Sequence, residues 1–141
     1  MATELLAQQR ARDALEQIAN IVNAPGAPAS YGNYLAYVKA LPANIRSLGL
    51  GQSLAFALAK AEGDLDKPYG LLYSHVTGWL CKRLIFGSDA TPENFMVKLT
   101  AGNQDKYLRA QIEAMAYLEW LKKFAVAKLK KPEGNAAGAD E

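Results

Sequence analysis

The sequence predicts an all-α fold: one compact domain of five to seven helices around a long C-terminal helix, with no sheet. Apolar residues recur with helical spacing in successive segments, and glycine and proline are concentrated between those segments. No segment alternates apolar and polar residues with period two. A chain of 141 residues, half of them hydrophobic, has the size and composition of one globular domain. We expect this domain to span residues 3–131, and residues 132–141 to form a disordered tail.

The segment from Asp105 to Lys131 predicts the longest helix, and we expect the other helices to pack around it. It contains no glycine or proline and is rich in residues of high helix propensity. Its apolar residues fall into two sectors of a helical wheel: Leu108, Ile112, Met115, Leu118 and Leu129, and then Tyr117, Leu121 and Phe124. A helix that is apolar over so much of its circumference is expected to be buried on both sectors.

The shorter helices are predicted at residues 3–22, 30–41, 43–48, 52–61, 69–85 and 92–99. Thr3 is the candidate N-cap of the first helix, and Ser30 is that of the second. Pro42 predicts a boundary or a kink, because the residue before a proline avoids the α region. Gly49 and Gly51 are expected to end one helix and begin the next.

Membrane insertion, export and disulfide bonding are not expected. The sequence has no run of about eighteen apolar residues. Its N-terminus also lacks the charged segment followed by an apolar segment that is typical of a signal peptide, so we expect a cytoplasmic protein. Cys81 is the only cysteine, which excludes an internal disulfide. Because His75 is the only histidine, a zinc site would need carboxylates for most of its ligands. We therefore expect neither a metal nor a cofactor.

No pattern in the sequence indicates catalysis. His75 is expected on the exposed side of its helix, without a partner that would orient it as a base. Cys81, without a second cysteine, is typical of a small buried hydrophobic residue. The glycines at 49–52 lack the Lys-Ser/Thr of a P-loop, and the pair Asp64 and Asp66 lacks the ligand series of a calcium loop. We therefore expect no catalytic residues.

Basic side chains are the remaining candidates for a binding function. The net charge is only +2, but the segment 122–131 holds five lysines and no acidic residue. Arg10 is expected to project away from the apolar face of its helix. Basic residues from several helices either converge on one phosphate-binding surface or are scattered over a solvated one, and the pattern leaves both possibilities open. They are Arg10, Arg12, Arg46, Lys82, Arg83, Lys98, Lys106, Arg109, Lys122 and Lys123.

Two phrases carry a resemblance to a known family. The first is Tyr34…Leu41-Pro42-x-x-Ile45-Arg46-x-x-Gly49-Leu50-Gly51-Gln52-x-Leu54-Ala55-Phe56. The second is Tyr107-x-Arg109-x-x-x-Glu113-Ala114-x-x-Tyr117-Leu118-x-Trp120-Leu121-Lys122-Lys123-Phe124-Ala125. Together with Arg10-Ala11, and over roughly residues 8–129, the chain resembles the small all-α subunit of type III-B CRISPR effector complexes, the Cmr complex.

The resemblance implies a subunit of an antiviral ribonucleoprotein that is not itself a nuclease. Such subunits stack as several copies into an inner filament beside the backbone subunits that hold the guide RNA. They also contact the large polymerase-like subunit, and a basic surface follows the target RNA of the guide–target duplex. The resemblance implies no cofactor and no membrane contact.

The resemblance also implies four RNA-contacting residues: Arg10, Arg46, Lys122 and Lys123 match basic positions of the family. Each also has a structural interpretation. Arg46 is equally suited to hold a helix end, and the two lysines complement the dipole at a helix C-terminus. A helical protein–protein adaptor that docks through its tyrosines and tryptophans, without RNA contact, is the competing function.

Overall fold

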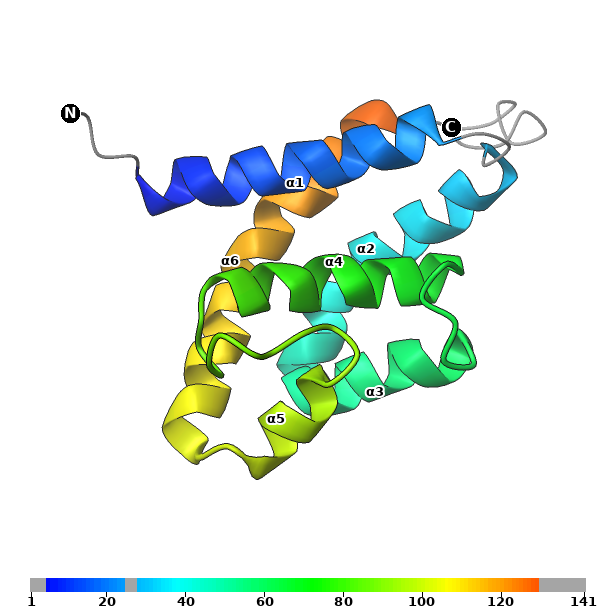
Figure 1. Cartoon of the computed structure of the whole chain (residues 1–141). Coiled ribbons are helices and arrows are strands. Elements are labelled where there is room, and N and C mark those ends of the chain that lie inside the picture. The colour runs from blue at the N-terminus through cyan, green and yellow to red at the C-terminus, as the bar shows by residue number, and fades with distance from the viewer. Residues whose placement is uncertain (1–4, 25–27, 130–141) are drawn as a thin grey trace.

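The computed structural model describes residues 5–24 and 28–129, and within these ranges it consists of six helices and no strand (Figure 1). This confirms the predicted all-α fold. The two ends of the predicted domain and the predicted tail at 132–141 lie outside the described residues, as does Thr3. The helices are α1 (Leu6–Asn23), α2 (Pro28–Leu48), α3 (Leu50–Lys60), α4 (Pro68–Lys82), α5 (Phe95–Ala101) and α6 (Gln104–Lys128).

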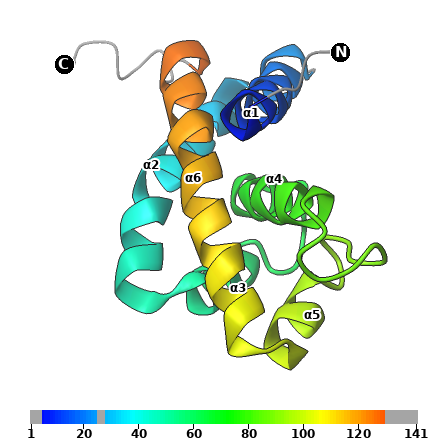
Figure 2. The ribbon, with the colours of Figure 1, turned by 90° about the vertical axis from the view of Figure 1, so that its left-hand side faces the viewer.

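Helix α6 is the central element, as predicted from its length and composition. It contacts α1, α2, α3 and α4. Figure 2 shows α6 in front, with α2 on one side, α4 on the other, and α1 seen end-on beside its C-terminal half. The Asn103 side chain caps it by accepting a hydrogen bond from the Lys106 N–H at 2.9 Å.

The core is continuous and rich in tyrosine. Tyr34, Tyr73 and Tyr117 are almost completely buried, together with leucines of α3, α4 and α6. Tyr37 of α2 stacks on Tyr69 of α4, with ring centroids 3.4 Å apart. These rings therefore hold the helices together rather than forming an exposed platform for bases.

The glycine turn at 49–51 joins two helices, as predicted. Gly49 has φ of 86°, which an L-residue adopts only with strain. The first free N–H groups of α3 are bound by side chains of α6: Leu50 donates to Gln111 Oε1 at 2.9 Å, and Gly51 donates to Tyr107 Oη at 2.7 Å. The donors that a phosphate would need at this helix start are thus already occupied.

Pro42 does not end a helix, so of the two predicted effects, a boundary or a kink, the boundary is wrong. It lies inside α2 and is buried. A proline in a helix interior removes one backbone hydrogen bond. The buried residues Val38, Leu41 and Ile45 lie on both sides of Pro42 in the sequence, so the packing of α2 against α4 and α6 outweighs that loss.

His75 is buried rather than exposed. Helix α4 contacts α1, α2, α3 and α6, and His75 lies against Tyr34 of α2, whereas Lys82 in its last turn stays exposed. The His75 Nδ1 lies 2.7 Å from the Tyr34 hydroxyl, and burial lowers the pKa of the imidazole to about 4. The helical wheel was wrong here because it assigned the side opposite the main apolar face to water, whereas His75 is covered by α2.

The predicted apolar sectors of α6 are only partly buried. Leu118 and Leu129 are in the core, but Leu108 and Ile112 are 46% and 69% exposed. Tyr117 and Leu121 of the second sector are buried as predicted, and the side that faces the core also includes Glu113 and three alanines. Hydrophobicity therefore identified the helix but misplaced part of its buried face.

Candidate functional site

Two carboxylates are buried where α1, α4 and α6 meet, and both are fully engaged. Glu113 of α6 accepts from Arg10 Nε at 2.7 Å, from Arg10 Nη2 at 2.9 Å and from Trp79 Nε1 at 2.8 Å. Asp13 of α1 accepts from Tyr117 Oη at 2.6 Å and from Lys82 Nζ. Each carboxylate therefore binds one cation and one aromatic donor.

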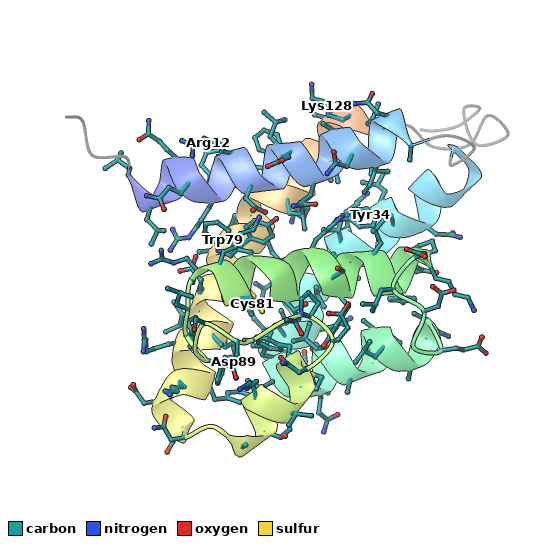
Figure 3. All side chains as sticks on the ribbon, viewed as in Figure 1. Arg12, Tyr34, Trp79, Cys81, Asp89 and Lys128 are labelled. Carbon is teal, nitrogen blue, oxygen red and sulfur yellow. The ribbon has the colours of Figure 1, made fainter. Side chains whose placement is uncertain are left out.

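The two aromatic donors connect the two carboxylates. The rings of Trp79 and Tyr117 stack with centroids 5.3 Å apart and an interplanar angle of 8°. Figure 3 shows Trp79 on α4 beneath α1, the helix that carries Arg12. Because α1 contributes one partner to each ion pair, this network fixes α1 on both α4 and α6.

The network sets the charge states of its members. Burial disfavours the charged form of Glu113, but hydrogen bonds from Arg10 and Trp79 offset that effect and lower the pKa of the carboxyl group. The hydrogen bond to Glu113 also raises the pKa of Arg10. Burial, and then the hydrogen bond to Asp13, raises the pKa of Tyr117 well above its ordinary value. Near neutral pH, Glu113 and Arg10 are therefore charged and the tyrosine is neutral.

Two shallow clefts lie beside this network. The first has a volume of about 270 Å³ and is lined by Gln9, Arg12, Asp13, Glu16 and Trp79. The second has a volume of about 250 Å³ and is lined by Arg83, Ile85, Arg109, Ile112 and Glu113. We call the cations of this region the basic junction: Arg10, Arg12, Lys82, Arg83 and Arg109.

The structure does not bring the four predicted RNA-contacting residues together. Arg10 lies against α6 and is only 19% exposed, so the expectation that it projects away from the apolar side of its helix was wrong. Arg46 is exposed in the last turn of α2. Lys122 follows Glu113 by nine residues, which is two and a half turns, or about 13 Å along α6 and on its opposite side. Lys123 is exposed and lies 3.5 Å from Glu119.

The junction adds two residues that sequence reasoning named only in a broad set. Arg83 follows α4 and Arg109 lies in the first half of α6, and both are exposed. Within the described residues neither forms an ion pair. No local pattern connects these two positions, because the contact between the end of α4 and α6 exists only in the folded chain.

The side chains considered for catalysis, His75, Cys81 and Asp64, lie in different surroundings. His75 is buried and bonded to Tyr34. Burial raises the pKa of the Cys81 thiol, which disfavours the reactive thiolate. Asp64 accepts a hydrogen bond from the Asp66 N–H in an exposed loop. In the part of the chain that the structure describes, no cluster of three or more His, Cys, Asp or Glu side chains is placed to hold a metal, and no helix is long and apolar enough to cross a membrane.

Comparison with known proteins decides the family. The model of the family described as CRISPR-associated protein (Cas_Cmr5) matches residues 6–128. The chain belongs to the Cmr5 family. Its fold is similar to that of a solved structure, the X-ray crystal structure of a CRISPR-associated Cmr5 family protein from Thermus thermophilus, with a TM-score of 0.70. That match has 24% sequence identity and covers 91% of this chain and all of the other.

Membership of the Cmr5 family identifies the chain as a small subunit of the Cmr complex, associated with other subunits of that complex. It also confirms the resemblance drawn from the two sequence phrases, both of which lie inside the matched range.

Proposed function

We propose that this Cmr5-family chain is a non-catalytic subunit of a cytoplasmic type III-B CRISPR effector that recognises RNA in antiviral defence. Copies of it stack in an inner filament beside the backbone subunits that hold the guide RNA, next to the large polymerase-like subunit. The family match over residues 6–128 carries this proposal. The hydrogen bonds of His75 and Asp64 and the raised pKa of the Cys81 thiol support a role without catalysis.

We also propose that the subunit contacts the target RNA through its phosphates, without reading its sequence. Arg46 and Lys123 are exposed, and Lys122 is half-buried. Long cationic side chains in such positions suit phosphate contact, which positions a strand without specifying bases. Arg10 acts first by holding Glu113, and any phosphate contact it makes uses the edge of its guanidinium that Glu113 leaves free.

Co-purification through a C-terminal tag from the native host tests the assignment to the complex. We expect recovery with the CRISPR backbone subunits, the large subunit and a guide RNA. Recovery alone, or with unrelated proteins and no RNA, would contradict the proposal and favour the adaptor function.

Reversing the charge of Lys122 and Lys123 tests the interaction with RNA. In the reconstituted complex, binding of target RNA should weaken and its dependence on salt should become shallower, by about 0.7 in log–log slope for each phosphate that is no longer bound. The thermal midpoint of the free subunit should hardly change, because exposed charges contribute little to stability.

A matched control is the double variant Lys60→Glu with Lys67→Glu. These lysines lie at the two ends of the loop that joins α3 to α4, outside α6, and the charge change is the same. Equal losses of RNA affinity in both double variants would show a general effect of net charge rather than a direct interaction of Lys122 and Lys123 with the RNA.

A further inference from the structure

Leu84 ends α4 in a conformation that does not suit leucine. It follows the C-cap residue Arg83, has φ of 60°, and donates its backbone N–H to the Cys81 carbonyl at 3.0 Å. Glycine is the usual residue at this left-handed position after a helix, because a Cβ atom is strained there. The leucine side chain gains little within the subunit in return, because 62% of it is exposed.

Glu62, which ends α3, shows that the leucine is not required for this kind of helix end. It has φ of 55° and donates its N–H to the Ala59 carbonyl at 3.0 Å, in the same arrangement. Its exposed side chain is charged and pairs with Lys67 at 2.8 Å, so water and a cation both solvate it. Leu84 instead combines backbone strain with an apolar side chain in water.

Leu84 stands beside further exposed apolar and cationic groups. Its chain neighbours Arg83 and Ile85 line the second cleft of the junction, opposite Arg109 and Ile112 of α6. Ile112 is 69% exposed, and Leu108, one turn earlier on the same side of α6, is also exposed. Glu113 at the wall of the cleft already accepts three hydrogen bonds, so it leaves Arg83 and Arg109 available to an outside partner.

We propose that Arg83, Leu84, Arg109 and Ile112 form a docking surface for a different protein subunit of the same complex. The partner would place an aliphatic side chain against Leu84 and Ile112, and a carboxylate between the two arginines. This inference rests on the proposed function only in taking the partner from the effector complex. Arginine is enriched at protein interfaces, and the buried centre of an interface is more apolar than the rest of the surface.

RNA and a second copy of this chain fit the surface less well. None of its four residues is aromatic, so it offers no ring on which a base could stack. A two-fold contact between copies would bring the arginines of one copy against those of the other.

The variant Leu84→Gly separates docking from stability, because the two effects have opposite signs. Relief of strain should raise the thermal midpoint of the free subunit by roughly 2–4 °C. Affinity for the purified complex assembled without this chain should fall by about tenfold or more, the loss expected when one apolar anchor is removed. A variant that is more stable and yet docks less well cannot owe its defect to misfolding.

Arg109→Glu and Ile112→Ala test the same surface without changing the backbone at the end of α4. Both variants should also bind the partner subunit less tightly. Val97→Ala is the matched control, since Val97 on α5 is as exposed as Ile112 and lies outside the docking surface. Binding of each variant would be measured to the purified backbone subunit, to the large subunit, to target RNA and to a second copy of this chain.

The outcomes distinguish this inference from the proposed function. Loss of binding to either of the other protein subunits by the three variants, with Val97→Ala unaffected, supports the docking surface. If all three variants assemble as well as the wild-type chain, the docking surface is overturned and the proposed function stands. A loss confined to RNA or to the second copy would also overturn it. Failure of the wild-type chain to bind any of these components would reject the proposed function and the docking surface together.

Discussion

Each side of α6 contains exceptions to the usual distribution of polarity. The side that faces the core includes Glu113 and Tyr117, while Leu108, Ile112 and Val126 on the other side are about half exposed or more. Burial on this helix therefore depends on whether a group finds its partners inside the subunit, and not on its hydrophobicity alone. Glu113 finds three donors, whereas Ile112 remains 69% exposed.

The two sides of α6 therefore differ in role: the inner side joins helices within the subunit, and the outer side is open to a neighbour. The inner carboxylate and tyrosine join α6 to α1 and α4, because each bonds to a residue of another helix. A buried ion pair contributes little net stability compared with an apolar core, but it specifies which groups must meet. The outer apolar residues contribute nothing comparable within the subunit and are available to a neighbour.

Adjacent substitutions on α6 give the largest expected contrast. Glu113→Ala should lower the free energy of unfolding by about 3 kcal/mol, because Arg10 and Trp79 lose their acceptor while remaining largely buried. Ile112→Ala should change it by less than about 0.5 kcal/mol. Urea unfolding of both variants measures the difference. Equal effects would mean that the outer side of α6 is also packed in the free subunit.

The sequence was sufficient for the fold class and for the central position of α6, because helix propensity and spacing are local properties. The glycine turn at 49–51 was also predictable from local sequence, and the structure confirms it. The helical wheel predicted the burial of His75 and Ile112 wrongly, because that burial is determined by how other helices pack around them. Tyr34 is the hydrogen-bond partner of His75, and it lies 41 residues away in the sequence. No window along one helix contains that information.

Less of the candidate site than of the fold could be predicted from the sequence. The family resemblance selected Arg10 as a basic position, but its main partner, Glu113, is 103 residues away and could not be paired with it by spacing. Arg83 and Arg109 appeared only in a broad set of cations. Their shared cleft depends on how the end of α4 meets α6, which is a tertiary contact.

Lowering the pH should destabilise the folded chain through its buried titratable groups, and His75 should be the first of them to act. Its pKa is about 4 in the folded chain, against about 6.5 when unfolded, so below pH 6.5 the unfolded state binds a proton that the folded state does not. The corresponding stability is complete above pH 6.5 and falls by about 2–3 kcal/mol as the pH approaches 4.

Chemical denaturation at several pH values measures this loss. Burial is the main cause of the lowered pKa, and the Asp13 carboxylate opposes it. In the variant His75→Gln the fall between pH 6.5 and 5 should largely disappear, since Glu113, whose folded pKa is lowered, loses its stabilising charge only in more acidic solution. Identical pH curves for wild type and variant would show that His75 is protonated without unfolding.

The smallest expected effect concerns the flank of α6, between its inner and outer sides, where Tyr107 and Gln111 bind the start of α3. Tyr107→Phe removes the hydroxyl that accepts from the Gly51 N–H and keeps the ring, so unfolding should become easier by about 1 kcal/mol, the usual contribution of one such bond. Amide exchange at Gly51 should accelerate more than exchange in the middle of α4. Gln111→Ala is the parallel test at Leu50. If Tyr107→Phe changed neither stability nor exchange, the flank of α6 would hold α3 by packing alone, and the GLG segment would keep its shape through the backbone of Gly49.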